Sequence, residues 1–137
     1  KIIVPTTGTS YSERAVELAC RLGLAQKAEI VVAYVIEVPF TLPLNAAMEK
    51  VEAIAKEALD RAVAIVEHRN LPVSPKIERA RKVGEGIVRL ATEENADLIV
   101  IGIRPIIGIP EKIMGRTSET VLRQAPCEVI VDRQPAS

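Results

Sequence analysis

The chain has 137 residues, of which 48% are hydrophobic and 26% are charged, values close to those of an average globular domain. Eighteen lysine and arginine residues balance eighteen aspartate and glutamate residues, so no net charge would attract nucleic acid or an anionic membrane. The aromatic residues are Tyr11, Tyr34 and Phe40, too few for a platform that stacks single-stranded bases. No apolar run reaches the roughly 18 residues that cross a bilayer. We therefore expect one domain over residues 1–137 that neither binds nucleic acid nor inserts into a membrane.

Five short segments are predicted to be strands. Four are apolar runs rich in valine and isoleucine, at residues 2–4, 30–35, 98–101 and 129–131. Such runs, without polar alternation, are typical of parallel strands that helices cover on both faces. The fifth segment, residues 76–80, is more polar, so we expect it at an edge of the sheet.

The segments between these strands carry helical periodicity. The expected helices span residues 10–23, 46–69, 83–95 and 117–124. In the first helix, the apolar stripe at helical spacing consists of Ala15, Leu18, Ala19 and Leu22. In the second helix, the stripe consists of Val51, Ile54, Ala58, Ala62, Ile65 and Val66.

This alternation of strands and helices predicts an α/β fold, an open doubly wound parallel sheet of five strands with helices on both faces. Right-handed crossovers favour the strand order 3-2-1-4-5, numbered along the chain. In that order the winding reverses between the first and fourth strands, and ligands of such sheets bind at the carboxyl ends there. Function is therefore expected at PTTGTS (residues 5–10) and GIRPIIGIPEKIMGRTSET (residues 102–120).

Residues typical of catalysis or metal binding are scarce. The one histidine, His68, lies near a helix end and is interpreted as solvated, since no Ser–His–Asp arrangement can be argued for it. No cluster of histidine and cysteine has metal-ligand spacing. Cys20 and Cys127 are too few for a disulfide framework and are interpreted as buried structural thiols. With no signal peptide evident in KIIVPTT, we expect a cytoplasmic protein without catalytic or metal-binding residues.

The sequence GEGIVR (residues 84–89) has the form of a dinucleotide fingerprint at the start of a helix. Its third glycine position holds Arg89, and the preceding strand is the expected edge strand. Close packing of the helix start against its neighbours is therefore the preferred interpretation.

The hydroxyl groups of PTTGTS have two interpretations. They are explained by capping of the next helix, with Thr9 or Ser10 as the N-cap. They are equally explained by contact with a ligand, because exposed hydroxyls and backbone N–H groups lie at the switch point of the sheet.

The stretch over residues 102–120 has features that favour an anion. Gly102 lets the backbone turn at the strand end, and Gly115 lets a ligand approach the start of the last helix. The free N–H groups and the dipole of that helix favour a phosphate. The stretch is not a P-loop, because no Gly-Lys-Ser/Thr follows.

The segments KIIVPTTGTSYSERAVELACRLG, ADLIVIGIR and GRTSETVLRQAPCEVIV, in order over nearly the whole chain, resemble the universal stress protein family. The resemblance implies the fold derived above, a stress-response or regulatory role without catalysis, and a homodimer formed through the last strand, residues 128–132. Many members bind ATP or AMP, and another group lacks this ability. ATP or AMP is thus the implied ligand, and no metal is expected.

The resemblance also implies a nucleotide site between the two loops. Its base and ribose side would be lined by Pro5, Thr6, Thr7 and Val35. Its phosphates would be held by Gly102, Arg104, Gly115, Arg116, Thr117 and Ser118.

Three positions in this site depart from the ATP-binding pattern of the family. That pattern reads Gly-x2-Gly-x9-Gly-Ser/Thr after the fourth strand, and here Pro105 takes the place of the second glycine and removes a backbone donor. Arg116 takes the serine or threonine position, which is the expected N-cap of the last helix. The capping box that a serine or threonine there would form with Glu119 is therefore broken. Thr7 replaces the aspartate of the first loop, which typically reads Val-Pro-x-Asp-Gly-Ser. We therefore expect weakened or altered nucleotide binding.

Arg116 itself has two interpretations. Its guanidinium can grip a phosphate with two parallel hydrogen bonds. Alternatively, it forms a solvated ion pair with Glu119 or Glu111, which would contribute little.

A second hypothesis is a nucleotide-independent dimeric interaction module that recruits a partner through its dimer surface or its long second helix. The sequence TLPLNA, followed by a long helix and a Gly-Arg-Thr loop, resembles a branch of the family appended to membrane transporters of amino acids. That resemblance implies the cytosolic regulatory domain of a larger protein. A weak ATPase is a third option, although no Mg²⁺ ligand is identified once the aspartate is replaced.

Overall fold

A computed structural model describes residues 1–105 and 115–135 of the chain. Its elements in order are β1 (Ile2–Pro5), α1 (Ser10–Gly23), β2 (Ile30–Glu37), α2 (Glu49–His68), β3 (Val73–Ala80), α3 (Val83–Glu93), β4 (Leu98–Ile103), α4 (Arg116–Gln124) and β5 (Glu128–Arg133). The strands form one sheet in the order β3-β2-β1-β4-β5, and all four pairings are parallel. The predicted fold class and strand order are confirmed.

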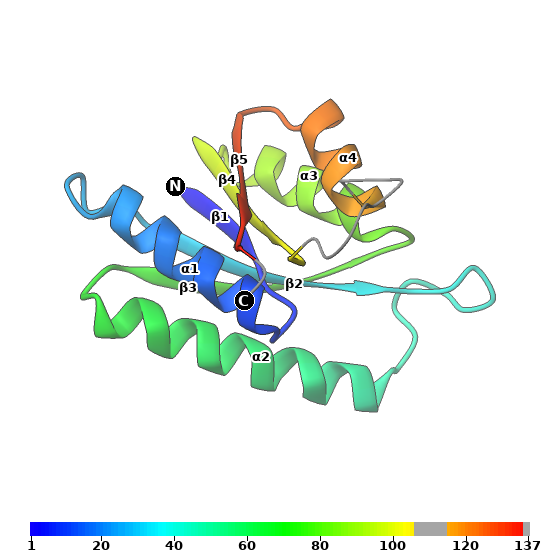
Figure 1. The fold of residues 1–137 in the computed structure, drawn as a ribbon. Coiled ribbons are helices and arrows are strands. Elements are labelled where there is room, and N and C mark those ends of the chain that lie inside the picture. Colours follow the sequence, from blue (N-terminus) through cyan, green and yellow to red (C-terminus); the bar gives the residue numbers. More distant parts are fainter. Residues whose placement is uncertain (106–114, 136–137) are drawn as a thin grey trace.

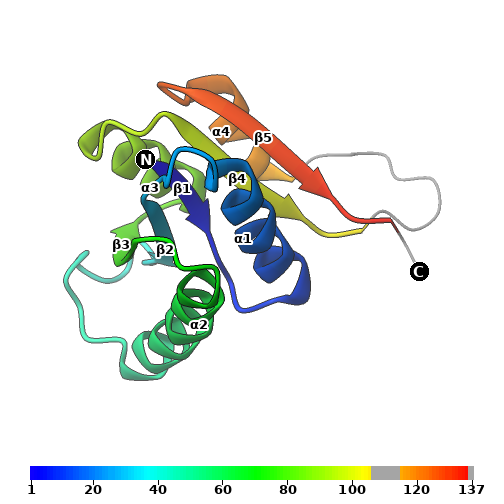
Figure 2. The same ribbon diagram turned by 90° about the vertical axis from the view of Figure 1, so that its left-hand side faces the viewer.

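Helices cover both faces of the sheet, with α1 and α2 on one face and α3 and α4 on the other (Figures 1 and 2). Successive side chains of a strand point to opposite faces. In β1, Val4 accordingly joins the core under α1 and α2, whereas Ile3 joins the core under α3 and α4. Both residues are fully buried, so each face of the sheet has its own apolar core.

The two edges of the sheet are β3 and β5. β3 was predicted at the edge, and it is, but it begins at Val73 rather than at residue 76. It pairs with β2 along its whole length, from Val73 opposite Ile30 to Ala80 opposite Glu37. Pro75 is tolerated within it because an edge strand needs its N–H groups on one side only.

Helix α2 begins three residues later than predicted, at Glu49. The preceding segment is held in a different conformation, since Arg79 donates to the carbonyl of Ala46 at 2.8 Å. The N–H of Met48 donates to the Glu52 carboxylate at 2.7 Å and so marks the start of the helix. Helix α3 ends at Glu93, two residues earlier than predicted, because Asn95 adopts a left-handed backbone with φ of 52°.

The predicted apolar stripes of α1 and α2 were partly wrong. In α1, Leu22 is 42% exposed, and the buried residues are Ser12, Ala15, Val16, Ala19, Cys20 and Gly23. In α2, Ile54 is 54% exposed, and the buried residues are Ala55, Ala58, Leu59, Ala62 and Val66. Small residues are buried in their place because the two helices also pack against each other, and ion pairs connect them.

In the described part of the chain, none of the helices combines the length and the apolar character needed to cross a membrane.

Candidate functional site

β1 and β4 separate before their carboxyl ends. Within the described strands their pairing stops at Ile3 opposite Ile99. β1 stays paired with β2 as far as Pro5, and β4 stays paired with β5 as far as Ile103. This is the expected geometry where the winding of the sheet reverses, and the two predicted loops begin on either side of the point of separation.

The loop after β1 is closed internally by hydroxyl groups. Thr6, which is 2% exposed, has its Oγ1 3.2 Å from Ser12 Oγ and accepts a hydrogen bond from the N–H of Gly8 at 3.4 Å. Thr9 Oγ1 accepts from the N–H of Ser12 at 3.3 Å, so Thr9 rather than Ser10 is the N-cap of α1. The hydroxyl of Ser12 donates in turn to the carbonyl of Thr9 at 2.9 Å. Thr6 and Thr9 therefore have structural roles within the loop.

Thr7 is the exposed hydroxyl residue of this loop. Its N–H donates to Ser12 Oγ at 3.2 Å, and its Oγ1 lies 2.9 Å from Thr9 Oγ1. The loop therefore presents a neutral pair of hydroxyls at the position where the family resemblance expects a carboxylate.

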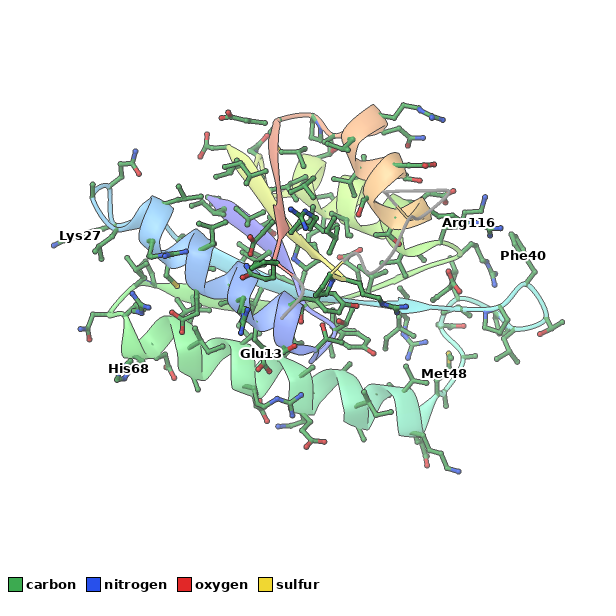
Figure 3. The ribbon with its side chains drawn as sticks, in the orientation of Figure 1. Glu13, Lys27, Phe40, Met48, His68 and Arg116 are labelled. Atoms are coloured by element: carbon green, nitrogen blue, oxygen red, sulfur yellow. The ribbon has the colours of Figure 1, made fainter. Side chains whose placement is uncertain are left out.

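Arg61 connects α2 to this loop at Gly8, and the sequence did not predict this contact. Gly8 has φ of 79°, a backbone conformation that L side chains rarely adopt, and a Cβ there would lie 2.7 Å from Arg61 Nη2. Arg61 donates from Nη2 to the carbonyl of Gly8 at 3.3 Å and from Nε to Glu13 at 3.0 Å. Figure 3 shows Glu13 between α1 and α2. No local sequence signal reveals this contact, since the residues lie far apart in the chain.

A glycine is needed at position 102 for a different reason from the predicted one. It lies inside β4, paired with Asp132, so the chain does not turn there. A Cβ at this position would lie 2.5 Å from the backbone carbonyl oxygen of Tyr11 and 3.1 Å from Ala15 Cβ. The start of α1 thus crosses directly over β4, and only glycine leaves room for it.

The start of α4 has no described side chain against it. Its N-cap is Gly115, not Arg116 as predicted, and no side chain caps it within the described chain. Arg116 is therefore the first helical residue and is exposed. The first intrahelical hydrogen bond runs from the N–H of Glu119 to the carbonyl of Gly115 at 3.0 Å, so residues 116–118 have no N–H partner inside the helix. Among described residues, nothing lies within 4 Å of a Cβ built on Gly115.

The remaining predicted residues differ in accessibility. Arg104 is exposed after β4, Thr117 is half-buried, and Ser118 is 5% exposed in the first turn of α4. Pro5 is half-buried at the end of β1. The predicted partner Glu111 lies outside the described residues. No ion pair between Arg116 and Glu119 is found in the described part of the chain.

Val35 is buried and faces α3. A Cβ on Gly86 would lie 2.7 Å from Val35 Cγ1, and one on Gly84 would lie 2.7 Å from Thr120 Cβ. The two glycines of GEGIVR therefore allow close packing of α3 on β2 and α4, which confirms the packing interpretation of that sequence.

The histidine and the cysteines show no reactive arrangement. His68 is exposed at the end of α2, as predicted. Cys20 is buried, whereas Cys127 is only partly buried, which corrects the expectation for that residue. Burial raises the pKa of both thiols, and a nearby carboxylate, Glu17 for Cys20 and Asp97 for Cys127, raises it further. In the described ranges, no group of three histidine, cysteine or acidic side chains is placed to hold a metal ion.

The chain matches the model of the Universal stress protein family over residues 1–133. A universal stress protein of Methanocaldococcus jannaschii is 30% identical, over 98% of this chain and 82% of that protein. A crystal structure of a protein from the same family from Burkholderia pseudomallei is 27% identical, with a TM-score of 0.74 over 97% of this chain and 95% of that one. The fold is also that of a universal stress protein from Archaeoglobus fulgidus in complex with dAMP, 22% identical with a TM-score of 0.77 over 95% and 94% of the two chains.

Proposed function

Because the chain belongs to the universal stress protein family, we propose that it is a regulatory domain without catalytic activity that binds an adenine nucleotide at the carboxyl ends of β1 and β4. Adenine is proposed because the solved structure with dAMP has the same fold. The side chains of Thr6 and Val35 are buried in the fold, so the proposed binding residues are the rest of the predicted set: Pro5, Thr7, Gly102, Arg104, Gly115, Arg116, Thr117 and Ser118.

The observation that carries this proposal is the start of α4, which follows the loop after β4 and which no described side chain caps. A helix start without a side-chain cap offers three N–H groups and the positive end of the helix dipole. Because no described residue lies close to Gly115, a phosphate can approach the backbone there. The exposed guanidinium of Arg116 lies at the first position of the same helix.

The same site supports an altered preference rather than ordinary ATP binding. Thr7 offers a hydroxyl that already lies within hydrogen-bonding distance of Thr9, and a hydroxyl is a weaker acceptor than a carboxylate. Pro105 supplies no N–H to a phosphate. We therefore propose weaker binding than the full pattern would provide, with Arg116 compensating on the phosphate side.

Isothermal titration calorimetry with AMP, ATP and cyclic AMP tests this function, with GMP and GTP as matched controls. We expect saturable heat with at least one adenine nucleotide and less with its guanine counterpart. No heat from any adenine nucleotide at millimolar concentration would refute the proposal.

We also propose a homodimer formed through β5. This strand lies at an edge of the sheet, with one side paired to β4, and its Val129, Ile130 and Val131 are only partly buried. An edge with unpaired backbone groups and apolar side chains favours association with another strand.

A second candidate function is the nucleotide-independent interaction module. It is favoured by the loop after β2, where Phe40 is 80% exposed. Two arginines hold this loop: Arg81 donates to the carbonyls of Pro39 and Leu42, each at 2.7 Å, and Arg79 donates to the carbonyl of Ala46. A loop held rigidly with an exposed aromatic side chain is suited to docking.

Site-specific photo-crosslinking in cell extract tests this second function. A photoreactive residue at position 40 should capture one partner whether or not nucleotide is added. The same residue at Glu93, exposed on α3, should not capture it. Equal capture at both positions would count against the module.

A further inference from the structure

A hollow of about 220 Å³ is lined by α1 and by residues that follow α2 and β5. Helices α1 and α2 lie side by side on this face of the sheet (Figures 1 and 2). We call the hollow the arginine pocket, and its lining residues are Arg14, Glu17, Arg21, Arg69 and Gln134. Three of them belong to α1 at a spacing of three and four residues, which places them on one face of that helix. Arg69 follows the end of α2, and Gln134 follows β5.

The charges of this pocket are unbalanced. Three guanidinium groups line it together with one carboxylate, that of Glu17, which pairs with Arg69. Arg14 donates instead to the neutral amide oxygen of Gln134 at 3.2 Å. Across residues 1–105 and 115–135, no ion pair involves Arg14 or Arg21.

One carboxylate just beyond this lining, that of Asp132, is hydrogen-bonded to Gln134. Asp132 accepts two hydrogen bonds from Nε2 of Gln134, each at 2.9 Å. The side chain of Gln134 is thereby oriented with its amide nitrogen toward Asp132 and its oxygen toward Arg14. The lining residues carry an excess of two positive charges, and the nearby Asp132 carboxylate lowers it to one, because hydrogen bonds from a neutral amide leave its charge in place.

We propose that the arginine pocket binds a small multivalent oxyanion, such as a pyrophosphate group. Guanidinium groups bind phosphate and carboxylate oxygens through paired hydrogen bonds and are more weakly hydrated than an ammonium group. The volume suits a small anion, since pockets for drug-sized ligands start at about 300 Å³. The pocket shares no residue with the candidate nucleotide site, so this inference does not depend on the proposed function.

Titration of isotope-labelled protein with sodium pyrophosphate at low ionic strength tests the proposal, with the arginine side-chain N–H signals and the α1 amides observed by NMR. We expect saturable shifts at Arg14, Arg21 and Arg69 that weaken as salt is added. Citrate is the second probe, because it carries carboxylates in place of phosphates. Binding of both probes supports a general oxyanion site, and binding of pyrophosphate alone supports a phosphate site.

Three variants separate a built site from general surface charge. Arg21→Ala removes an exposed guanidinium and should lower the affinity about fivefold, the effect of an exposed charge pair. Glu17→Gln removes the competing carboxylate and should raise it. Arg123→Ala, an exposed arginine on α4 at the opposite face, should leave it unchanged. Shifts that do not saturate, or an equal loss in Arg21→Ala and Arg123→Ala, would overturn the proposal.

Discussion

Nη2 of Arg61, on α2, lies 3.3 Å from the backbone carbonyl oxygen of Gly8, to which it donates a hydrogen bond. The same guanidinium pairs with Glu13 on α1 and Glu57 on α2. The loop after β1 is therefore held from both helices of that face, and its conformation at Gly8 depends on a residue far along the chain.

Arg61→Ala should loosen this loop without unfolding the domain. The pairs that it removes are partly exposed, so we expect the free energy of unfolding to fall by less than about 1 kcal/mol. Amide hydrogen exchange at residues 7–9 should become faster, because the hydrogen bond to Gly8 is lost. Lys56→Ala is the matched control, since Lys56 pairs with Asp60 on the same helix and does not contact the loop. Unchanged exchange in Arg61→Ala would show that the loop is rigid on its own.

Gly102→Ala should destabilise the fold. The added Cβ would lie 2.5 Å from the carbonyl oxygen of Tyr11, so α1 must shift away from β4. Such overpacking costs about 1–3 kcal/mol, measured by urea denaturation. Gly115→Ala is the comparison, because its Cβ would meet open space among described residues and its φ of −81° suits any residue. It should cost less than about 1 kcal/mol, the difference between glycine and alanine at an N-cap. Equal losses would contradict the packing role of Gly102.

Arg116→Ala should weaken nucleotide binding through the phosphates. We expect the affinity for ATP to fall about fivefold while that for adenosine stays the same, because an exposed charge pair contributes up to about 1 kcal/mol. Calorimetry with both ligands measures the difference. Arg123→Ala, at the end of the same helix, controls for net charge. If adenosine loses as much affinity as ATP, Arg116 does not contact the phosphates.

The cysteines should differ in reactivity, with Cys127 modified before Cys20. Both thiols have raised pKa values, but Cys20 is buried, whereas Cys127 is partly exposed. A folded-state pKa above the unfolded value favours the neutral thiol, so its contribution to stability is present at neutral pH. That contribution is lost as the pH rises past the ordinary thiol pKa and through the higher folded one.

The free energy of unfolding should therefore fall less steeply between pH 8 and pH 10 in Cys20→Ala than in the natural sequence. Urea denaturation at both values measures this, and alkylation at pH 8 followed by mass spectrometry measures the order of modification. Equal slopes, or modification of Cys20 first, would contradict the burial of its thiol.

Ile130→Lys should convert the proposed dimer into a monomer. Its side chain is partly buried on edge strand β5, and a charge there would be desolvated when a second strand associates. Native mass spectrometry reports the oligomeric state and any bound nucleotide together. Ile77→Lys, on the other edge strand, is the control and should remain dimeric. A monomer in the natural sequence would exclude this interface.

The architecture was predictable because strands and helices leave local periodic patterns. Apolar runs predicted four of the five strands, and a more polar segment predicted the fifth at an edge. The handedness of crossovers then limited the strand order to the one observed. The position of the candidate site followed from that order, since parallel strands direct their carboxyl ends to one edge.

The faces of the helices and the reasons for individual glycines were not predictable. Ile54 and Leu22 fit an apolar stripe by spacing, but α1 and α2 pack against each other as well as against the sheet, which rotates the buried face toward smaller residues. The backbone was predicted to turn at Gly102, whereas the role of this glycine is to let the backbone of Tyr11 approach β4.

The sequence by itself determined the fold class, the strand order and the pair of loops at the switch point, because these depend on patterns within about twenty residues. Only the tertiary structure decided that Thr6 is enclosed in its loop, that Arg61 holds Gly8, and that the N-cap of α4 is Gly115 rather than Arg116. Those features depend on contacts between elements and on helix boundaries that shift by one residue, and neither leaves a periodic pattern in the chain.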